Sequence, residues 1–425
     1  METSLTTAQL DSIRASALKS DFPLLAANPH LAFLDSAATA QRPIAVLDAQ
    51  RHFYETMNAN PLRGLYKLSV EATQAIANAR THIARFVGAL DEAGEPQRDA
   101  IVFTRNASEA LNLLAQTLSR LTKLGPGDEV VISIMEHHSN LIPWQQVCKQ
   151  TGADLVYLRT DSDYRITQEE IERKIGPRAK IVSVTHVSNV LGVENDVAAI
   201  AARAHEVGAL CVVDGAQSVP HIHVDVRALG CDFLAFSGHK LGGPLGIGVL
   251  WGKPELLDAM PPFLTGGEMI DLVTETGAVW SPAPQKFEAG TQDAAGAYAT
   301  DAALSYLEGL GMRAVEERER LLSIYLCERL RELPQIAIIG PKEGERHISS
   351  ISFDVKDVHP HDVASILDMY DVCIRAGHHC AQPLLTYLGW HSTCRASVAF
   401  YNDAGDIDRL IDGLNQVWRI FHGSR

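Results

Sequence analysis

Residues 210–240, LCVVDGAQSVPHIHVDVRALGCDFLAFSGHK, contain two short apolar runs, LCVVD and FLAF, that each lead into polar and glycine residues. Five more runs of this kind are IVFT (101–104), VVISI (130–134), LVYL (155–158), IVSV (181–184) and IGVLW (247–251). Amphipathic stretches such as 107–121, 142–151 and 198–207 separate them. Strands that are apolar on both faces and alternate with helices are typical of parallel sheets. We therefore expect an α/β fold with a mostly parallel seven-stranded sheet.

The pattern changes after about residue 300. Residues 302–330 predict two helices interrupted at Gly309–Gly311. Short strands are expected after them at 348–353, 372–375 and 395–400, with helices at 361–370 and 407–421. This organisation predicts a large domain over residues 31–299 and a smaller α+β domain over residues 300–425. Residues 1–30 are predicted to form a helical segment that packs with the small domain.

Composition narrows the class of protein. The chain has 425 residues, 37 basic and 52 acidic side chains, a net charge of −15, 46% hydrophobic residues and 21% charged residues. Single cores stop growing at roughly 250–300 residues, so more than one domain is expected. These values exclude a disordered, collagen-like or coiled-coil chain. The acidic balance also predicts no nucleic-acid and no membrane partner.

Cysteine usage and the N-terminus indicate the compartment. Seven cysteines are an odd and sparse set for this length, which argues against a disulfide framework and for a reducing environment. The first 25 residues have neither the positive nor the apolar segment of a signal peptide. No apolar run approaches the roughly 18 residues that cross a bilayer. We therefore expect a cytoplasmic enzyme.

Polar residues at the carboxyl ends of the predicted strands are the candidate site, because ligands bind at this edge of a parallel sheet. Lys240 follows FLAF in Ser237-Gly238-His239-Lys240. Such a lysine can form a Schiff base with a carbonyl cofactor, and Ser237 and His239 can hold a phosphate. Asp214 ends LCVVD and can pair with a pyridinium nitrogen, while Gln217 reaches a ring hydroxyl. A solvated lysine and a capping aspartate are the alternatives.

Two further strand ends carry candidate groups. Ala107 and Ser108 open a predicted helix whose free amides form an anion site, although Asn106 and Glu109 also fit a capping box. His137, in Met-Glu-His-His-Ser-Asn (135–140), can stack on a ring or move protons. A zinc site at His137 and its neighbour is disfavoured, because adjacent histidines rarely bind one metal. Asn189 ends the fourth run and could equally be a turn residue.

The small domain contains a second candidate, Arg-Ala-Gly-His-His-Cys-Ala-Gln-Pro (375–383). Cys380 lies on this glycine-containing loop beside two histidines and an arginine. Neighbouring positive charges favour the reactive thiolate, while a structural cysteine or a Cys/His metal site are alternatives. Arg395 is placed where a strand begins, and its planar guanidinium suits bidentate carboxylate binding. A surface arginine is the alternative.

Eight motifs in one order support a family resemblance. The chain resembles group II cysteine desulfurases of the SufS/CsdA type, which are pyridoxal 5'-phosphate (PLP) enzymes of fold type I with the aspartate-aminotransferase fold. The motifs are LDSAA (34–38), RGLYKLS (63–69), MEHHSNLIPW (135–144), THVSNVLG (185–192), VVDGAQ (212–217), FSGHKLGGPLGIG (236–248), FEAGTQ (287–292) and RAGHHCAQP (375–383).

The resemblance implies a role for each matching position. Lys240 corresponds to the PLP lysine, Asp214 to the partner of the pyridine nitrogen, Gln217 to the ligand of the ring oxygen, and His137 to the stacking histidine. The phosphate-binding residues correspond to Ala107, Ser108, Ser237, His239 and, from the other subunit of a homodimer, Thr291. The resemblance assigns catalysis to Lys240, Cys380 and His137. It implies no resident metal.

The resemblance also implies the reaction. Asn189 and Arg395 correspond to the groups that receive the carboxylate of L-cysteine. Cys380 corresponds to the nucleophile that takes the sulfur as a persulfide, leaving L-alanine, and an acceptor protein carries the sulfur to iron–sulfur cluster assembly. Leu62 and Tyr66 stand where histidines are common, so substrate preference or acceptor handling is expected to differ.

Several alternatives remain open at this level. Selenocysteine lyase activity would use the same cofactor chemistry and differ mainly in the leaving atom. A racemase or kynureninase-like lyase of the same fold would leave Cys380 unused. A zinc-binding scaffold would instead use His378, His379 and Cys380. The sulfur acceptor is either a zinc-bearing SufU-like protein or a SufE-like protein. His361, nineteen residues before Cys380, matches a histidine that takes over a zinc ligand from SufU-like partners, but it also fits a helix N-terminal turn.

Overall fold

The central sheet has seven strands and is mostly parallel, as predicted. A computed structural model describes residues 5–423, except for the side chain at position 345. In it the strand order is β2-β8-β7-β6-β5-β3-β4. The pairs from β7 to β4 are parallel, whereas β8 is antiparallel to β7 and β2. The strands are β2 (Ile101–Thr104), β3 (Glu129–Ser133), β4 (Asp154–Leu158), β5 (Ala179–Thr185), β6 (Leu210–Asp214), β7 (Phe233–Ser237) and β8 (Gly248–Gly252).

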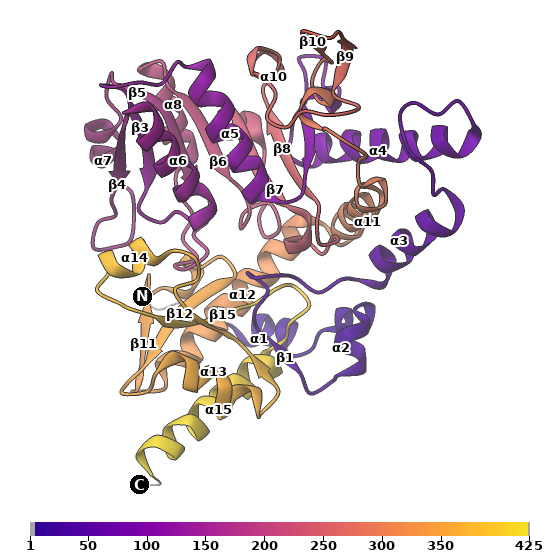
Figure 1. Cartoon of the computed structure of the whole chain (residues 1–425). Coiled ribbons are helices and arrows are strands. Elements are labelled where there is room, and N and C mark those ends of the chain that lie inside the picture. Colours follow the sequence, from indigo (N-terminus) through magenta and orange to yellow (C-terminus); the bar gives the residue numbers. More distant parts are fainter. Residues whose placement is uncertain (1–4, 424–425) are drawn as a thin grey trace.

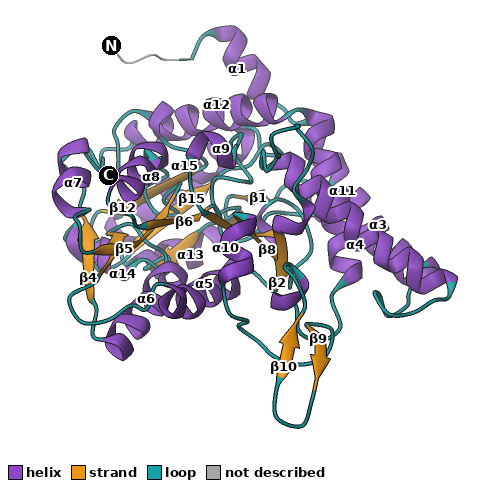
Figure 2. Cartoon of the chain, turned by 90° about the horizontal axis from the view of Figure 1, so that it is seen from above, coloured by secondary structure: helices purple, strands orange, loops and turns teal. Residues whose placement is uncertain are grey.

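Helices cover both faces of this sheet (Figures 1 and 2). Along β3, Val130 and Ile132 pack in a cluster with α5 (Ala107–Leu121) and α6 (His138–Thr151). Val131 points the other way and packs in a cluster that includes α8 (Val197–Glu206), α4 (Lys67–Phe86) and α11 (Ala294–Leu310). Successive side chains of a strand face opposite sides, so an uninterrupted apolar run serves two cores. The remaining helices of this part are α3 (Ile44–Thr56), α7 (Gln168–Lys174), α9 (Val226–Leu229) and α10 (Pro254–Ala259).

The C-terminal part has its own antiparallel sheet in the order β11-β12-β15-β14. These strands are β11 (Ile336–Ile339), β12 (Ser350–Val355), β15 (Thr393–Ser397) and β14 (Arg375–Gly377). Their apolar side chains cluster with α12 (Met312–Arg331), α13 (Pro360–Asp368) and α15 (Ala404–His422), and α14 (Gln382–Tyr387) follows the cysteine loop. The predicted domain boundary falls within α11, which runs unbroken across residue 300. The division into domains stays a prediction.

The N-terminal segment contacts both parts of the molecule. It contains α1 (Thr7–Ile13), α2 (Pro23–Ala27) and β1 (Ala32–Phe33), and β1 pairs in parallel with β13 (Val372–Cys373). Ile13 packs in the C-terminal cluster, whereas Phe22 packs in a cluster of the large sheet. Among the described residues, no helix is both long and apolar enough to cross a membrane.

Several predicted boundaries were wrong. The strand expected at 395–400 is β15 and ends at Ser397, because Asn402 holds a turn by accepting from Ala399 N at 2.8 Å. Arg395 therefore lies in the middle of a strand rather than at its start. The single strand expected at 372–375 is split into β13 and β14, which pair in different sheets. The hairpin of β9 (Ile270–Val273) and β10 (Ala278–Trp280), which projects from the body in Figure 2, was not predicted.

Candidate active site

One cavity of about 310 Å³ brings together nearly all of the predicted site residues. It lies beyond the carboxyl ends of β5, β6 and β7, at the N-termini of α5 and α6, and against the loop that follows β14. The predicted residues that line it are Ala107, Ser108, His137, Asn189, Asp214, Gln217, Ser237, His239, Lys240, Cys380 and Arg395. Thr291 and His361 lie outside it.

Lys240 and Asp214 reach this cavity from adjacent strands. β6 and β7 are paired in parallel, with Asp214 opposite Ala235, and Lys240 follows three residues after β7 ends. Burial lowers the pKa of Lys240 to about 8, and the Asp214 carboxylate partly opposes that shift. Burial raises the pKa of Asp214, while Lys240 and a hydrogen bond from Ala216 N to Oδ1 (3.0 Å) lower it. The site therefore holds an amine that is easily deprotonated beside a buried carboxylate.

His137 is neutral in this environment. It is the N-cap of α6, and its Nδ1 accepts a hydrogen bond from Ser139 N at 3.1 Å. Burial lowers the pKa of His137 to about 3, and the positive charge of Lys240 adds to the effect. An acceptor at Nδ1 places the ring proton on Nε2. A neutral imidazole suits contact with an aromatic ring better than proton donation near pH 7.

The N-terminus of α5 carries the predicted anion-binding amides. Asn106 Oδ1 accepts from Glu109 N at 3.0 Å, as expected for a cap. The reciprocal half of the predicted capping box does not form, because the Glu109 carboxylate accepts from Arg105 N at 2.5 Å instead. Ser237 Oγ accepts from Ala107 N at 2.9 Å, so β7 is joined to the start of this helix.

Hydroxyl groups also line this cavity. Ser108 Oγ and Ser139 Oγ lie 2.5 Å apart, and His239 Nδ1 lies 3.1 Å from Thr39 Oγ1. Sequence reasoning missed Thr39 and Ser139. Ser139 could have been found from its place two residues after His137. Thr39 gives no such local signal, because it joins the cavity from a segment 200 positions before His239.

Arg395, the predicted carboxylate-binding residue, is buried. Its Nη1 donates to Asn189 O at 2.8 Å and its Nη2 pairs with Asp35 Oδ1 at 3.3 Å. Its Nε is buried without a hydrogen-bond partner among the described residues. Burial lowers the pKa of Arg395 to about 10, which leaves it charged near pH 7. Asn189 Nδ2 donates to His379 O at 2.7 Å, so this amide already holds the cysteine loop.

Cys380 differs from the other cysteines of the chain. All seven are unpaired, but Cys380 is the exposed one, whereas Cys373 is half-buried and the others are buried. The thiol loop follows β14 and lines the same cavity as Lys240. Arg375, which the sequence analysis named only as a positive neighbour of the thiol, also lines the cavity and pairs with Asp35 at 2.8 Å.

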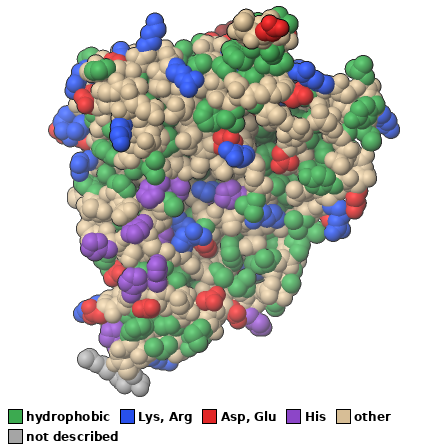
Figure 3. Space-filling view, in the orientation of Figure 1, with side chains coloured by type: hydrophobic (Ala, Val, Ile, Leu, Met, Phe, Trp, Pro, Cys, Tyr) green, Lys and Arg blue, Asp and Glu red, His purple; other side chains and the backbone are tan. Residues whose placement is uncertain are grey.

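Two predicted residues lie apart from this cavity. Thr291 is exposed and lines a different cavity, which also involves Glu109, Gly246 and Leu264. His361 is exposed at the start of α13, where the ring of His359 forms the N-cap by accepting from His361 N at 3.3 Å. In the space-filling view, histidine side chains gather on the face between the two parts of the molecule (Figure 3).

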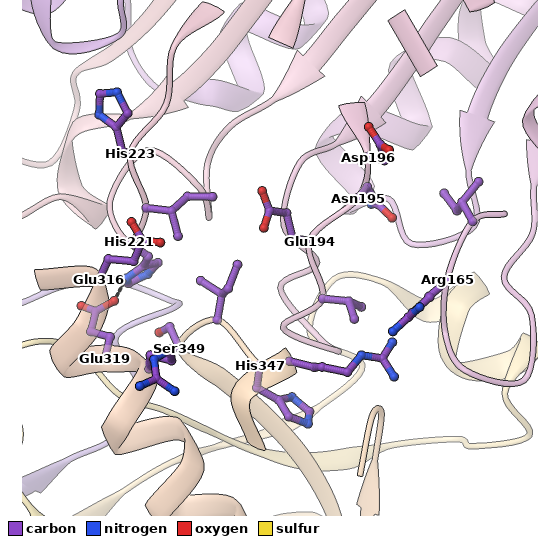
Figure 4. Close-up of a pocket in the computed structure, with 16 residues that line it drawn as sticks. Arg165, Glu194, Asn195, Asp196, His221, His223, Glu316, Glu319, His347 and Ser349 are labelled. Carbon is purple, nitrogen blue, oxygen red and sulfur yellow. Dashed lines mark hydrogen bonds and ion pairs between the residues drawn. The ribbon is translucent and has the colours of Figure 1, made fainter. Parts of the chain in front are cut away.

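A larger cavity of about 570 Å³ contains none of the predicted residues. It lies between loops of the large sheet and helix α12, and Figure 4 shows charged side chains around it, including Arg165, Glu194 and Glu316. His221 Nδ1 and Glu319 Oε2 form a buried pair on its wall, 2.8 Å apart. Although this cavity is the larger of the two, it is not the candidate active site, because none of the predicted catalytic or cofactor-binding residues line it.

The residues of the smaller cavity fit PLP. Lys240 offers an amine that is partly neutral near pH 8, as a group that binds an aldehyde must be. Asp214 offers a buried carboxylate for a ring nitrogen, and the start of α5 offers amides and hydroxyls for a phosphate. The Nε of Arg395, which has no partner within residues 5–423 as described, offers a further donor for an amino-acid carboxylate.

Comparisons with known proteins agree with this chemistry. The aminotransferase class-V family matches residues 32–410. A probable cysteine desulfurase of Streptomyces coelicolor is 45% identical over 412 residues, covering 95% of this chain and 97% of the relative. The cysteine desulfurase of Cronobacter sakazakii is 42% identical, covering 95% and 98%. The crystal structure of the cysteine desulfurase CsdA from Escherichia coli superposes with a TM-score of 0.86 at 36% identity, covering 98% of this chain and all of the other.

Proposed function

The chain belongs to the aminotransferase class-V family and is a PLP-dependent cysteine desulfurase, and from this premise we propose that Cys380 captures the sulfur of L-cysteine as a persulfide. The observation that carries this proposal is the place of Cys380: an exposed thiol that lines the same cavity as Lys240 and Asp214. The proposed products are L-alanine and a sulfur atom passed on for iron–sulfur cluster assembly.

Several residues would hold the cofactor. Asp214 would pair with the ring nitrogen, Gln217 would meet the ring oxygen, and His137 would lie against the ring. The phosphate would be bound by Ala107, Ser108, Ser237 and His239 of the same subunit. Thr291 would reach it from the other subunit of the dimer. When bound, PLP supplies an electron sink for negative charge at the substrate Cα. Gln217 Nε2 already donates to Ala37 O at 2.8 Å, which fixes the orientation of this amide.

The substrate would be oriented by its carboxylate. The charged Arg395 presents an Nε without a partner in the described part of the chain, and its other nitrogens are anchored to Asn189 and Asp35. A guanidinium held on two sides loses little freedom when it binds a carboxylate. Lys240 would then take the proton from Cα, since its lowered pKa provides a neutral amine near pH 8.

Cys380 would complete the reaction. Its thiolate attacks the substrate sulfur, forming an S–S bond while the Cβ–S bond breaks. The electron pair of the broken bond stays on the amino-acid skeleton, and a proton completes alanine. Atoms balance because one thiol and one cysteine give one persulfide and one alanine. Proton transfer by Lys240 would contribute roughly 10²–10⁴-fold to the rate.

The test compares Cys380→Ser with the wild type for alanine formation and for persulfide. We expect the variant to retain cofactor absorbance and to lose desulfuration. Full activity in Cys380→Ser would refute the proposal and favour a racemase or a kynureninase-like lyase of this fold.

We further propose that the enzyme is a homodimer. The hairpin β9–β10 exposes Leu272 and Trp280, and Leu65 on the arm before α4 is 98% exposed. Arg63 pairs with Glu268 at 2.9 Å, which joins that arm to the segment before the hairpin. These exposed apolar side chains, on two segments that the ion pair joins, support a subunit interface, because contiguous apolar patches mark protein–protein contacts. A monomer with full turnover in analytical ultracentrifugation would contradict this proposal.

A zinc-bearing SufU-like acceptor is proposed to receive the sulfur, rather than a SufE-like protein. His361 is exposed, and its Nε2 lies 3.8 Å from the position that a Cβ would take at Gly377, three residues before Cys380. A neutral imidazole there can replace a zinc ligand of the partner and free a thiolate beside the persulfide. The unpaired cysteines support a reducing compartment, and we propose the cytoplasm.

Persulfide transfer from wild type and His361→Ala to a SufU-like and a SufE-like acceptor tests this proposal. We expect only transfer to the zinc protein to fall, with desulfuration in chemical reductant unchanged. Equal transfer by the variant to the zinc protein would show that His361 is only part of a helix cap.

A further inference from the structure

The loop that carries Cys380 has a backbone that needs external support. His379 and Cys380 have φ values of 50° and 54°, which lie in the left-handed region. Residues with a Cβ enter this region at a cost, and two in succession persist only where the surrounding structure holds them. The contacts around Cys380 should therefore include the groups that supply this support.

His138, at the start of α6, bonds to the carbonyl of the nucleophile residue and to the amide two residues after it. Its backbone N donates to Cys380 O at 2.6 Å. Its ring Nε2 accepts a hydrogen bond from Gln382 N at 3.2 Å. The Gln382 amide is the first amide of α14. The first amides of a helix have no partner within the helix, so a side chain that accepts from one of them stabilises the helix start. One residue thus fixes both the carbonyl of Cys380 and the start of the helix that follows it.

We propose that His138 is a positioning residue that holds the Cys380 thiol in the geometry required for attack on the substrate sulfur. This inference rests on the proposed role of Cys380. The neighbouring His137 lines the cavity wall, so two consecutive residues connect that wall to the nucleophile loop. Asn189, which donates to His379 O, supports the same loop from the segment that follows β5.

The ring must be neutral to accept at Nε2. Burial lowers the pKa of His138 below its ordinary value, and the nearby His378 adds to this effect. The neutral ring then carries its proton on Nδ1. The side chain therefore acts as a hydrogen-bond acceptor, and a glutamine, whose Oε1 can occupy a similar position, should replace it.

The experiment compares His138→Ala, His138→Gln and a matched control, His391→Ala, in the cofactor-loaded protein. His391 is exposed, and no hydrogen bond of its side chain is found among the described residues. Hydrogen exchange at the Gln382 amide, cofactor absorbance, kcat and the KM for L-cysteine are measured. We expect His138→Ala to raise the exchange rate and lower kcat by about 10-fold each, the effect of one lost hydrogen bond. Absorbance and KM should stay within twofold.

The conservative variant and the control make the outcome decisive. His138→Gln should restore both exchange and kcat to within about threefold of the wild type, and His391→Ala should change neither. The proposal is overturned if His138→Ala leaves kcat unchanged or if His138→Gln is as impaired as His138→Ala. It is also overturned if kcat falls as far in the control His391→Ala as in His138→Ala. Full turnover by Cys380→Ser would instead overturn the proposed function, while exchange at Gln382 would still report on the contact itself.

Discussion

Replacing Arg395 with lysine tests how the site recognises the substrate carboxylate. Arg395 donates to Asn189 O through Nη1, pairs with Asp35 through Nη2, and keeps Nε unpartnered among the described residues. A lysine has one nitrogen in place of three and cannot make these contacts while also binding a substrate. The change retains the charge and removes the fork of donors.

The expected loss follows from this geometry. A hydrogen bond to a charged group contributes about 1.5–3 kcal/mol, which corresponds to roughly 10- to 100-fold in affinity. We therefore expect Arg395→Lys to raise the KM for L-cysteine by about 10- to 100-fold, with unchanged cofactor absorbance. Steady-state alanine formation over a range of cysteine concentrations measures this effect.

Arg375→Lys is the matched comparison. Arg375 uses Nε and Nη2 on the same Asp35, but it is half-exposed, and exposed ion pairs contribute only about 0–1 kcal/mol. Its lysine variant should raise KM by less than about fivefold. A KM within twofold of the wild type for Arg395→Lys, or a larger effect from Arg375→Lys, would refute this account of carboxylate binding.

Three further outcomes are expected. Lys240→Ala should abolish desulfuration and the absorbance of the lysine-bound cofactor, and borohydride labelling of a different lysine would contradict the assignment. Because the pKa of Lys240 is lowered to about 8, its neutral fraction rises from roughly a tenth at pH 7 to nine-tenths at pH 9. The rate at which cofactor-depleted protein recovers absorbance with PLP should rise through that window and then level off, and a flat profile would exclude this pKa. Burial raises the pKa of Glu136 to about 8, so the folded state holds a proton that the unfolded state loses above pH 4.5. Glu136→Gln should therefore gain stability relative to the wild type from pH 5 to pH 8, by roughly 1–3 kcal/mol in thermal or urea unfolding, and a constant difference would argue against the shift.

Local sequence determined the strands of the large sheet and the groups at their ends. A strand buried on both faces must be apolar throughout, and the first polar residue after it lies at the edge of the sheet. For this reason the run LCVVD predicted both β6 and the place of Asp214, and FLAF predicted β7 and the place of Lys240. The cysteine loop could also be found, because a lone thiol among histidines and arginine has a chemical meaning within nine residues.

Only the tertiary structure decided how these groups are held. Asp35 joins Arg375 and Arg395 across 340 and 360 positions, and Asn189 bonds to His379 across 190. The sequence also misplaced the end of β15, since the turn after it depends on a hydrogen bond to Asn402. The hydrogen bonds that join His138 to Cys380 O and to Gln382 N belong to the same class of contact. Apolar periodicity is a local property of the chain, whereas the pairing of polar atoms depends on which distant segments the packed core brings within about 3 Å.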